Sequence, residues 1–223
     1  MIVEPLEPVD GDLPGPLLTE LAALYASDHA FQQLSGDFPD PEAIRPEQVA
    51  ASLADELAEP GAEVLLARSA GRLVAVAVTL AQVPDPCGTR TGATPLSDGE
   101  PEGGPAPAPD AAARPASGTS GTISTSATSA TSSTSGTSGP DAWIGLLMVH
   151  GEMRRIGHGR RLAEVVERRF GDAGRSGVRL GVLESNTRAL AFWTALGYEE
   201  IDRRPDRRLG RPCVVLRKDL TGT

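Results

Sequence analysis

The chain has 223 residues, of which 39% are hydrophobic, and this is enough for one sizeable folded domain. Its formal charge of -9 argues against nucleic acid as the main partner, because nucleic-acid-binding surfaces are basic. The start of the chain lacks the basic and apolar regions of a secretory signal, and the longest apolar run, at 73–83, is too short to span a bilayer. We therefore expect a cytoplasmic protein with no membrane partner.

The charge is divided unevenly along the chain. Residues 1–83 carry 14 acidic residues and three arginines, a net charge of -11, whereas 141–223 carry 16 basic and 11 acidic residues, a net charge of +5. This asymmetry indicates two ligands of opposite sign, a cationic one at the front half and an anionic one at the back half. Acidic helices that simply keep the front half soluble are the alternative interpretation.

The two cysteines, Cys87 and Cys213, lie far apart and form no CxxC or His-paired pattern. The sequence therefore predicts neither a disulfide scaffold nor a metal site, and a reducing compartment fits this composition.

The front half shows the periodicities of both strands and helices. We expect a short strand at 1–6 and an amphipathic helix at 15–34, which has Pro16 in its first turn and leucines at helical spacing. A second helix begins at 47 and ends before Pro60 and Gly61. Two strands follow, at 63–68 and 72–83, joined by a tight turn at 70–71.

The pattern is lost between 84 and 140, where Pro, Gly and Ala give way to a Ser/Thr/Gly run with no apolar periodicity. Such a segment cannot offset its ordering entropy by burial, so we expect a disordered insertion between two halves of one domain, 1–83 and 141–223. A modification or docking role for the insertion is the alternative.

Regular patterns return at 142–149 with a strand. A helix with an apolar stripe follows from about Gly159, and it ends at the glycines of GDAGRSG. We then expect a strand at 178–184, a helix at 187–196, and two last strands at 198–204 and 213–218.

Two glycines, Gly157 and Gly159, lie at the predicted N-terminus of this helix. They are flanked by four arginines: Arg154, Arg155, Arg160 and Arg161. A helix N-terminus presents unpaired amides and a partial positive charge, so this stretch is suited to hold a diphosphate. The third glycine of a Rossmann loop is replaced by Leu162, and the GKS or GKT of a Walker loop is absent. A simple tight strand-to-helix turn is the alternative.

The block LMVHGEMRRIGHGRRL has a corner valine at Val149, a leading arginine at Arg154 and glycines at Gly157 and Gly159. The block NTRALAFWTALGY has Asn186, Ala189, the aromatic pair Phe192 and Trp193, and then Gly197 and Tyr198. Together these two blocks resemble the GCN5-related N-acetyltransferase (GNAT) family. The resemblance is strong over 142–198 and extends to the order of the elements in 1–83.

The resemblance implies a mixed α+β fold with a central, mostly antiparallel sheet that is splayed at the cofactor site and flanked by helices. It also implies acetyl-CoA as the co-substrate, with its pantetheine along a bulged strand and its pyrophosphate in the glycine loop. The asparagine at the start of the next helix would help to fix the pantetheine, although an N-cap needs the same side chain. The implied cofactor-binding residues are Leu147, Met148, Val149, Arg154, Arg155, Ile156, Gly157, His158, Gly159, Arg160, Asn186 and Trp193.

The expected catalytic groups of the family are missing here. Many members have a tyrosine that protonates the leaving thiolate at the position of Trp193, and a carboxylate base at the position of Gly181. A thiolate whose conjugate acid has a pKa of about 8–9 can leave without an acid, so we interpret Trp193 as packing against the core or the cofactor. Glu184 is expected to point to the opposite face of its strand, and His150 follows the corner valine.

Four residues that we expect in the loop between the front helices could contact a substrate or move a proton, although solvation is the alternative: Asp28, His29, Asp37 and Asp40. The catalytic residues stay unassigned. The leading hypothesis is an acetyl-CoA-dependent N-acetyltransferase acting on a primary amine of a cationic small molecule, such as a polyamine or an aminoglycoside, or of a peptide. The alternative is an acetyl-CoA-binding module with little catalysis. The oligomeric state is left open, and a homodimer is compatible with the sequence.

Overall fold

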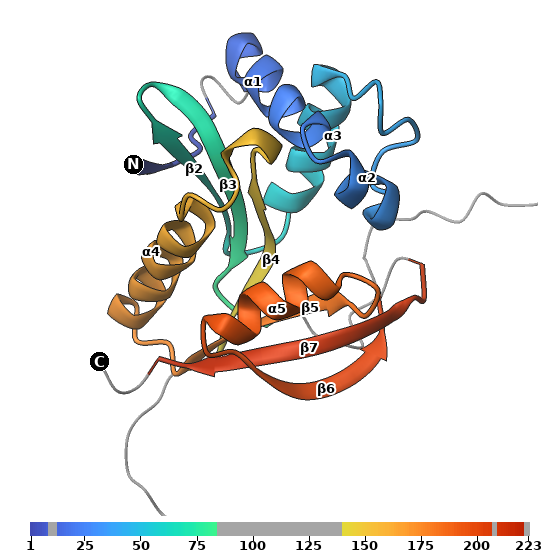
Figure 1. Ribbon diagram of the computed structural model, residues 1–223. Helices are drawn as coiled ribbons and strands as arrows, with labels where there is room; N and C mark the ends of the chain where they lie inside the picture. Colours follow the sequence, from blue (N-terminus) through green and yellow to red (C-terminus); the bar gives the residue numbers. More distant parts are fainter. Residues whose placement is uncertain (9–12, 84–139, 207–208, 221–223) are drawn as a thin grey trace, which may run out of the picture. The chain divides into compact units, whose positions relative to one another are not determined.

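The computed structural model describes residues 1–8, 13–83, 140–206 and 209–220 (Figure 1). The predicted insertion at 84–140 therefore lies outside the described residues, apart from Pro140. The stretches on either side of it fold together into one unit.

Among the described residues, seven strands form one sheet in the order β1-β2-β3-β4-β5-β7-β6. Neighbouring strands are antiparallel except for β4 and β5, which are parallel, and this confirms the mostly antiparallel sheet. The strands are β1 (Ile2–Pro5), β2 (Ala62–Ser69), β3 (Arg72–Leu80), β4 (Ala142–Val149), β5 (Gly177–Leu183), β6 (Glu199–Pro205) and β7 (Pro212–Asp219).

The parallel pair opens along its length. Only residues 142–144 of β4 pair with β5, at residues 178–180, and the two strands separate beyond Ile144. β4 also carries a bulge, because Ile144 pairs with Thr79 and Leu146 with Val78, which leaves Gly145 between them. A bulge bends a strand and increases its local twist, so Gly145 stands where β4 must turn away from β5.

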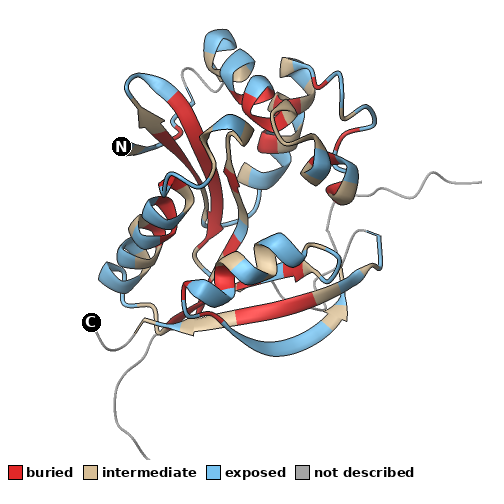
Figure 2. Ribbon diagram, viewed as in Figure 1, coloured by how far each residue is buried: buried red, intermediate tan, exposed pale blue. Residues whose placement is uncertain are grey.

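Helices cover both faces of the sheet, as Figure 1 shows. α1 (Gly15–Ala26) and α3 (Pro46–Leu57) pack on one face, joined by α2 (His29–Ser35), whereas α4 (His158–Asp172) and α5 (Thr187–Ala195) pack on the other. The buried residues, red in Figure 2, belong to two apolar clusters, one on each face. β3 is buried on both faces, which explains why its sequence is a continuous apolar run instead of an alternating one.

The prediction of a single helix at 15–34 is wrong, because this stretch forms two helices, α1 and α2. The Ser27 hydroxyl turns back to donate to the carbonyl of Leu24 at 2.6 Å, and the Asp28 carboxylate accepts the amide of Phe31 at 3.2 Å. Ser and Asp side chains offer the backbone such alternatives to a continuous helix. The apolar periodicity survives this break, so periodicity alone did not reveal it. Asp28 therefore lies between α1 and α2 as the N-cap of α2, whereas His29 is the first residue of α2 and not part of a loop.

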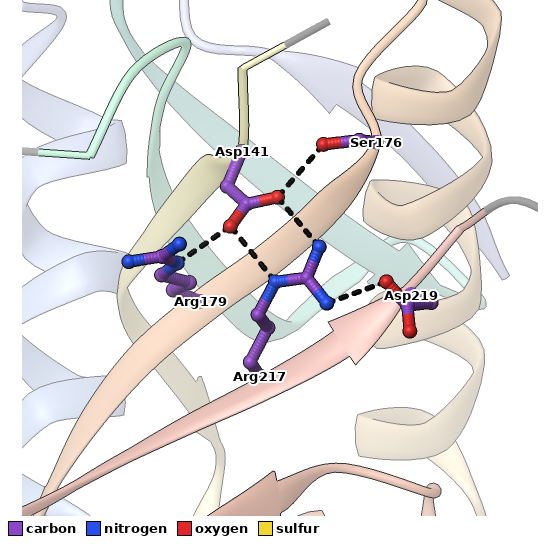
Figure 3. Close-up of polar contacts among 5 residues, drawn as sticks. All are labelled: Asp141, Ser176, Arg179, Arg217 and Asp219. Atoms are coloured by element: carbon purple, nitrogen blue, oxygen red, sulfur yellow. Dashed lines mark hydrogen bonds and ion pairs between the residues drawn. The ribbon is translucent and has the colours of Figure 1, made fainter. Parts of the chain in front are cut away.

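Asp141, immediately before β4, lies at the centre of a polar cluster that ties β4 to β5 and β7 (Figure 3). Arg217 donates to both carboxylate oxygens, at 2.8 Å and 3.0 Å, Arg179 donates at 2.5 Å, and the Ser176 hydroxyl donates at 2.9 Å. The hydrogen bond from Arg217 is the largest of the effects that hold the pKa of Asp141 at about 2. The cluster thus fixes the paired end of β4 and β5, from which the two strands diverge.

Candidate functional site

The separation of β4 from β5 leaves part of β4 with one unpaired side. The amide of His150 donates to the carbonyl of Val74 at 2.8 Å, so the backbone of His150 faces β3. Backbone groups alternate in direction along an antiparallel pair, so Met148 also faces β3, while Leu147 and Val149 face away from it. Within the described residues, no strand pairs with these groups of Leu147 and Val149, which we call the open edge of β4.

The chain then passes through a short 3-10 turn, Gly151–Met153, and a strained loop into α4. Arg155 has a φ of 64° and Gly157 a φ of 91°, both in the left-handed region, so the predicted start of the helix moves to His158 with Gly157 as its cap. The first amide of α4 with a backbone partner is that of Arg161, which donates to the carbonyl of Gly157. No side chain caps the helix. The amides of residues 158–160 therefore have no acceptor in the part of the chain that the structure describes.

The two glycines of the motif have different structural roles. A Cβ on Gly157 would meet nothing within 4 Å, so the space in front of this cap is open, and its φ favours glycine. A Cβ on Gly159 would lie 3.3 Å from Val149 and 3.4 Å from Phe192. Gly159 thus allows α4 to approach the end of β4 and α5, a packing role that the sequence did not distinguish from ligand approach.

The arginines of the motif are also divided between two roles. Arg154 forms an ion pair with Asp28 at the start of α2, and burial, then the nearby charge of Arg188, lower the pKa of its guanidinium. Arg155 and Arg160 are exposed beside the open cap. Arg188, in the first turn of α5, was not singled out from the sequence, although its charge contributes to the lowered pKa of Arg154.

Two further residues of the loop differ in exposure. The imidazole of His158 is buried, and its Nδ1 has no hydrogen-bond partner. Ile156 is 59% exposed. A buried, unpaired polar atom at the first residue of α4 is the kind of group that a bound ligand or water satisfies.

Asn186 and Trp193 lie on α5. The Asn186 side chain accepts the amide of Ala189 at 3.1 Å, so it is the N-cap of α5, and its amide nitrogen has no partner among the described residues. Trp193 is buried and packs edge-on against Phe192 and Tyr198, each at 4.9 Å between ring centroids. Trp193 is therefore a core residue, and its expected contact with the cofactor stays a prediction.

No described group replaces the missing acid and base at their usual positions. Burial, reinforced by Glu167, raises the pKa of the Tyr198 phenol well above its usual range, which makes it a poor proton donor. The space beside Gly181 is occupied, because a Cβ there would lie 3.1 Å from the sulfur of Cys213. Burial raises the pKa of that thiol as well. Glu184 follows the end of β5 and pairs with Arg203.

The structure brings one of the four front-half candidates, Asp28, into contact with the glycine loop. His29 lies 3.6 Å from Glu42, and the Asp40 carboxylate accepts the amide of Glu42 at 2.9 Å, so both belong to a surface network. Asp37 is exposed between α2 and α3. His150 accepts the amide of Glu152 at 3.4 Å, a local contact within the loop after β4.

Sequence reasoning missed three residues that connect the halves: Ser27, Gly151 and Arg211. The Gly151 amide donates to the Ser27 hydroxyl at 2.8 Å, and Arg211 donates to the carbonyls of Leu34 and Ser35 at 2.6 Å and 2.9 Å. These contacts join residues more than 120 positions apart. A single sequence carries no local signal for such pairings.

Residues 108–198 match the family described as the acetyltransferase (GNAT) family. The match covers less than half of the chain, and with the fold described above it indicates an acyltransferase of the GNAT class. Enzymes of that family use acetyl-CoA as co-substrate and act on amines. No curated protein matches the chain. Among the described residues, no helix has both the length and the apolar character needed to cross a bilayer.

Solved structures share the fold at low sequence identity. The ribosomal-protein-S18-alanine N-acetyltransferase from Escherichia coli aligns with a TM-score of 0.53 and 15% identity, over 100% of this chain and 95% of that one. An acetyltransferase from Thermus thermophilus aligns with a TM-score of 0.56 and 14% identity, over 98% and 97%. An aminoglycoside 6'-N-acetyltransferase complexed with coenzyme A aligns with a TM-score of 0.52 and 14% identity, over 100% and 99%. These likenesses confirm the GNAT fold.

Proposed function

We propose that the protein transfers the acetyl group of acetyl-CoA to a primary amine of a cationic small molecule, of the polyamine or aminoglycoside type, or of a peptide. The observation that carries the proposal is the meeting of two sets of unpaired backbone groups. The open edge of β4 ends where the uncapped amides of residues 158–160 begin α4. A pantetheine arm and a diphosphate need these two kinds of partner, in that order along the ligand.

The residues present fit acetyl-CoA. The diphosphate would lie in front of Gly157, where the space is open, and accept hydrogen bonds from the amides of residues 158–160. Arg155 and Arg160 are exposed beside it and add positive charge. The orphaned Nδ1 of His158 is a further group that a bound ligand or its water could satisfy.

The arm of the cofactor would extend along the open edge of β4. The backbone groups of Leu147 and Val149 face that edge, and the unpaired amide nitrogen of Asn186 supplies a donor from α5. When bound, acetyl-CoA supplies an acetyl group activated as a thioester. An unpaired amide of the open edge, that of Leu147 or Val149, would be the donor that stabilises negative charge on the thioester oxygen.

The chemistry then depends on the amine arriving neutral. Its nitrogen forms the new C–N bond as the C–S bond breaks, and its proton passes to water or to a carboxylate. The thiolate leaves without an acid from Trp193, which has none to give, and this is feasible because thiols have a pKa of about 8–9. We therefore expect activity to rise with pH as the amine loses its proton.

The class of acceptor is inferred from the negative charge of the front half. The front half carries a net charge of -11, and the segment that follows α2 includes Asp37, Asp40 and Glu42. Such a surface favours an acceptor with several positive charges over a neutral one. An aminoglycoside acetyltransferase and an S18-alanine acetyltransferase with the same fold support the two acceptor classes, a polycationic small molecule and a peptide end.

The test is a thiol-release assay with acetyl-CoA and a panel of acceptors: spermidine, kanamycin, a basic peptide with a free N-terminus, and a neutral amine of similar size. We expect release with at least one cationic acceptor, lost when its amine is acetylated in advance. Release that is equal for the cationic and the neutral amine would contradict the charge argument. Calorimetry with coenzyme A measures cofactor binding separately.

A catalytically weak acetyl-CoA-binding module is the second candidate. It is favoured by Trp193 and Gly181, which stand where the family's acid and base are expected, and by the occupied space beside Gly181. Binding of coenzyme A without thiol release on any acceptor of the panel would favour this candidate over the enzyme.

A further inference from the structure

We propose that α2 is a brace that couples the glycine loop to the acceptor side of the site, with Asp28, Arg154 and Arg211 as its positioning residues. The coupling between cofactor and acceptor rests on the proposed function, whereas the brace itself rests on contacts among described residues. In this arrangement Arg154, the leading arginine of the glycine motif, positions α2 and is not a ligand of the diphosphate.

The N-terminal end of α2 is held by one carboxylate that serves two partners. Asp28 caps α2 through the amide of Phe31, at 3.2 Å, and its other oxygen pairs with Arg154. The Asp28 and Arg154 side chains are only 15% and 28% exposed, so this pair is screened less than a surface ion pair. The residue that starts α2 is thereby tied to the loop that starts α4.

A second contact fixes the same corner. The Gly151 amide donates to the Ser27 hydroxyl at 2.8 Å, and the Ser27 hydroxyl donates in turn to the Leu24 carbonyl at 2.6 Å. The backbones approach so closely that a Cβ on Gly151 would lie 2.2 Å from the Ser27 carbonyl oxygen. The loop after β4 therefore cannot shift without moving the corner between α1 and α2.

The C-terminal end of α2 is held by the other half of the splayed sheet. Arg211, just before β7, donates to the carbonyls of Leu34 and Ser35, and its Nε pairs with Asp206 at 2.7 Å. A cation at the last carbonyls of a helix also complements the helix dipole. α2 thus runs from the loop after β4 to the connection between β6 and β7, two segments that belong to opposite sides of the β4–β5 separation.

This placement gives α2 a function in the site. A ligand that orders the glycine loop would also restrict Arg154 and Gly151, and through them Asp28 and Ser27. The acidic residues that follow α2, which support the charge argument for the acceptor, would then adopt their final position only after the cofactor binds. We infer a positive coupling, in which the cofactor raises the affinity for the amine.

The experiment measures amide hydrogen exchange of residues 29–35 in the full chain, with and without coenzyme A. Asp28→Asn keeps the N-cap, because asparagine caps as well as aspartate, and removes the ion pair. Arg154→Gln removes the same pair from the other side, and Arg154→Lys keeps the charge. Arg168→Gln, on the exposed side of α4, is the matched control for the loss of one arginine.

We expect Asp28→Asn and Arg154→Gln each to speed exchange in α2 by about tenfold, and the double variant by no more than either, as for two residues that share one interaction. Arg154→Lys should recover part of the protection, and Arg168→Gln should match the wild type. Coenzyme A should slow exchange in α2 of the wild type but not of the two uncoupled variants. Their KM for the amine should rise while their affinity for coenzyme A changes less than about threefold.

The outcomes separate the two proposals. Unchanged exchange in both single variants would overturn the brace. A loss of coenzyme A affinity in Arg154→Gln with wild-type affinity in Asp28→Asn would also overturn it, and would make Arg154 a phosphate ligand. If the wild type fails to bind coenzyme A, the proposed function fails, and exchange in the unliganded variants still decides whether Asp28 and Arg154 hold α2.

Discussion

Replacing Asp141 with asparagine tests the cluster that fixes the paired end of β4 and β5 (Figure 3). The Asp141 side chain is only 6% exposed and accepts hydrogen bonds from Arg217, Arg179 and Ser176. These partners, Arg217 foremost, lower its pKa from 3.8 to about 2, against the effect of burial. Each pKa unit corresponds to about 1.4 kcal/mol, so the charged carboxylate stabilises the fold by about 2 kcal/mol at neutral pH.

The pH dependence follows from the direction of the shift. Because the pKa is lower in the folded state, the contribution is complete above the unfolded value of 3.8 and is lost as the pH falls toward 2. About half of it should be gone at pH 3. Asp141→Asn should therefore lower the free energy of unfolding by about 2 kcal/mol at pH 7, a shift of roughly 4–8 °C in Tm, and the gap to the wild type should narrow below pH 4.

Urea unfolding followed by circular dichroism, from pH 7 to pH 3, measures both quantities. Asp219→Asn is the matched control, because Asp219 also pairs with Arg217 but its side chain is 67% exposed. We expect Asp219→Asn to lower the free energy of unfolding by no more than about 1 kcal/mol. A loss in Asp141→Asn as small as in the control, or a gap to the wild type that stays constant down to pH 3, would refute the reasoning.

Three further changes test the site and the fold. Gly157→Trp fills the open space and should weaken coenzyme A binding at least about tenfold. Gly157→Ala shares its backbone strain, roughly 1–2 kcal/mol, without the bulk, and equal affinities in calorimetry would place the diphosphate elsewhere. Gly151→Ala brings a Cβ to 2.2 Å from Ser27, and we expect about 1–3 kcal/mol less stability in urea, where an unchanged midpoint would contradict the contact. Replacing residues 84–139 by a short turn should keep a cooperative melt, because Leu80 and Trp143 already pair, and a lost melt would show that the segment is needed.

The sequence predicted most of the elements because their signals are local. The apolar stripe of α4, the Ala70–Gly71 turn and the run of β3 each report on neighbours within one element. The break between α1 and α2 was missed because Ser27 and Asp28 interrupt the helix without interrupting its apolar spacing. Local signals thus indicated the type of each element better than its ends.

The candidate site was likewise predictable only where its signals are local in the sequence. The spacing of Gly157 and Gly159 predicted the position of the glycine loop. It did not predict their separate roles, because the packing of Gly159 depends on Val149 and Phe192. The partner of Arg154 could not be inferred either, because Asp28 lies 126 positions earlier and only the folded chain brings the two together.

The open edge of β4 is made of main-chain groups, and this has a consequence for how the protein can change over time. Peptide groups are the same whichever side chains accompany them, so substitutions along β4 can repack the interior while the hydrogen-bonding pattern offered to a ligand persists. Divergence to 14–15% identity with enzymes of the same fold is compatible with such a surface. Acceptor preference, which we propose to depend on side chains of the front half, would then be free to change separately.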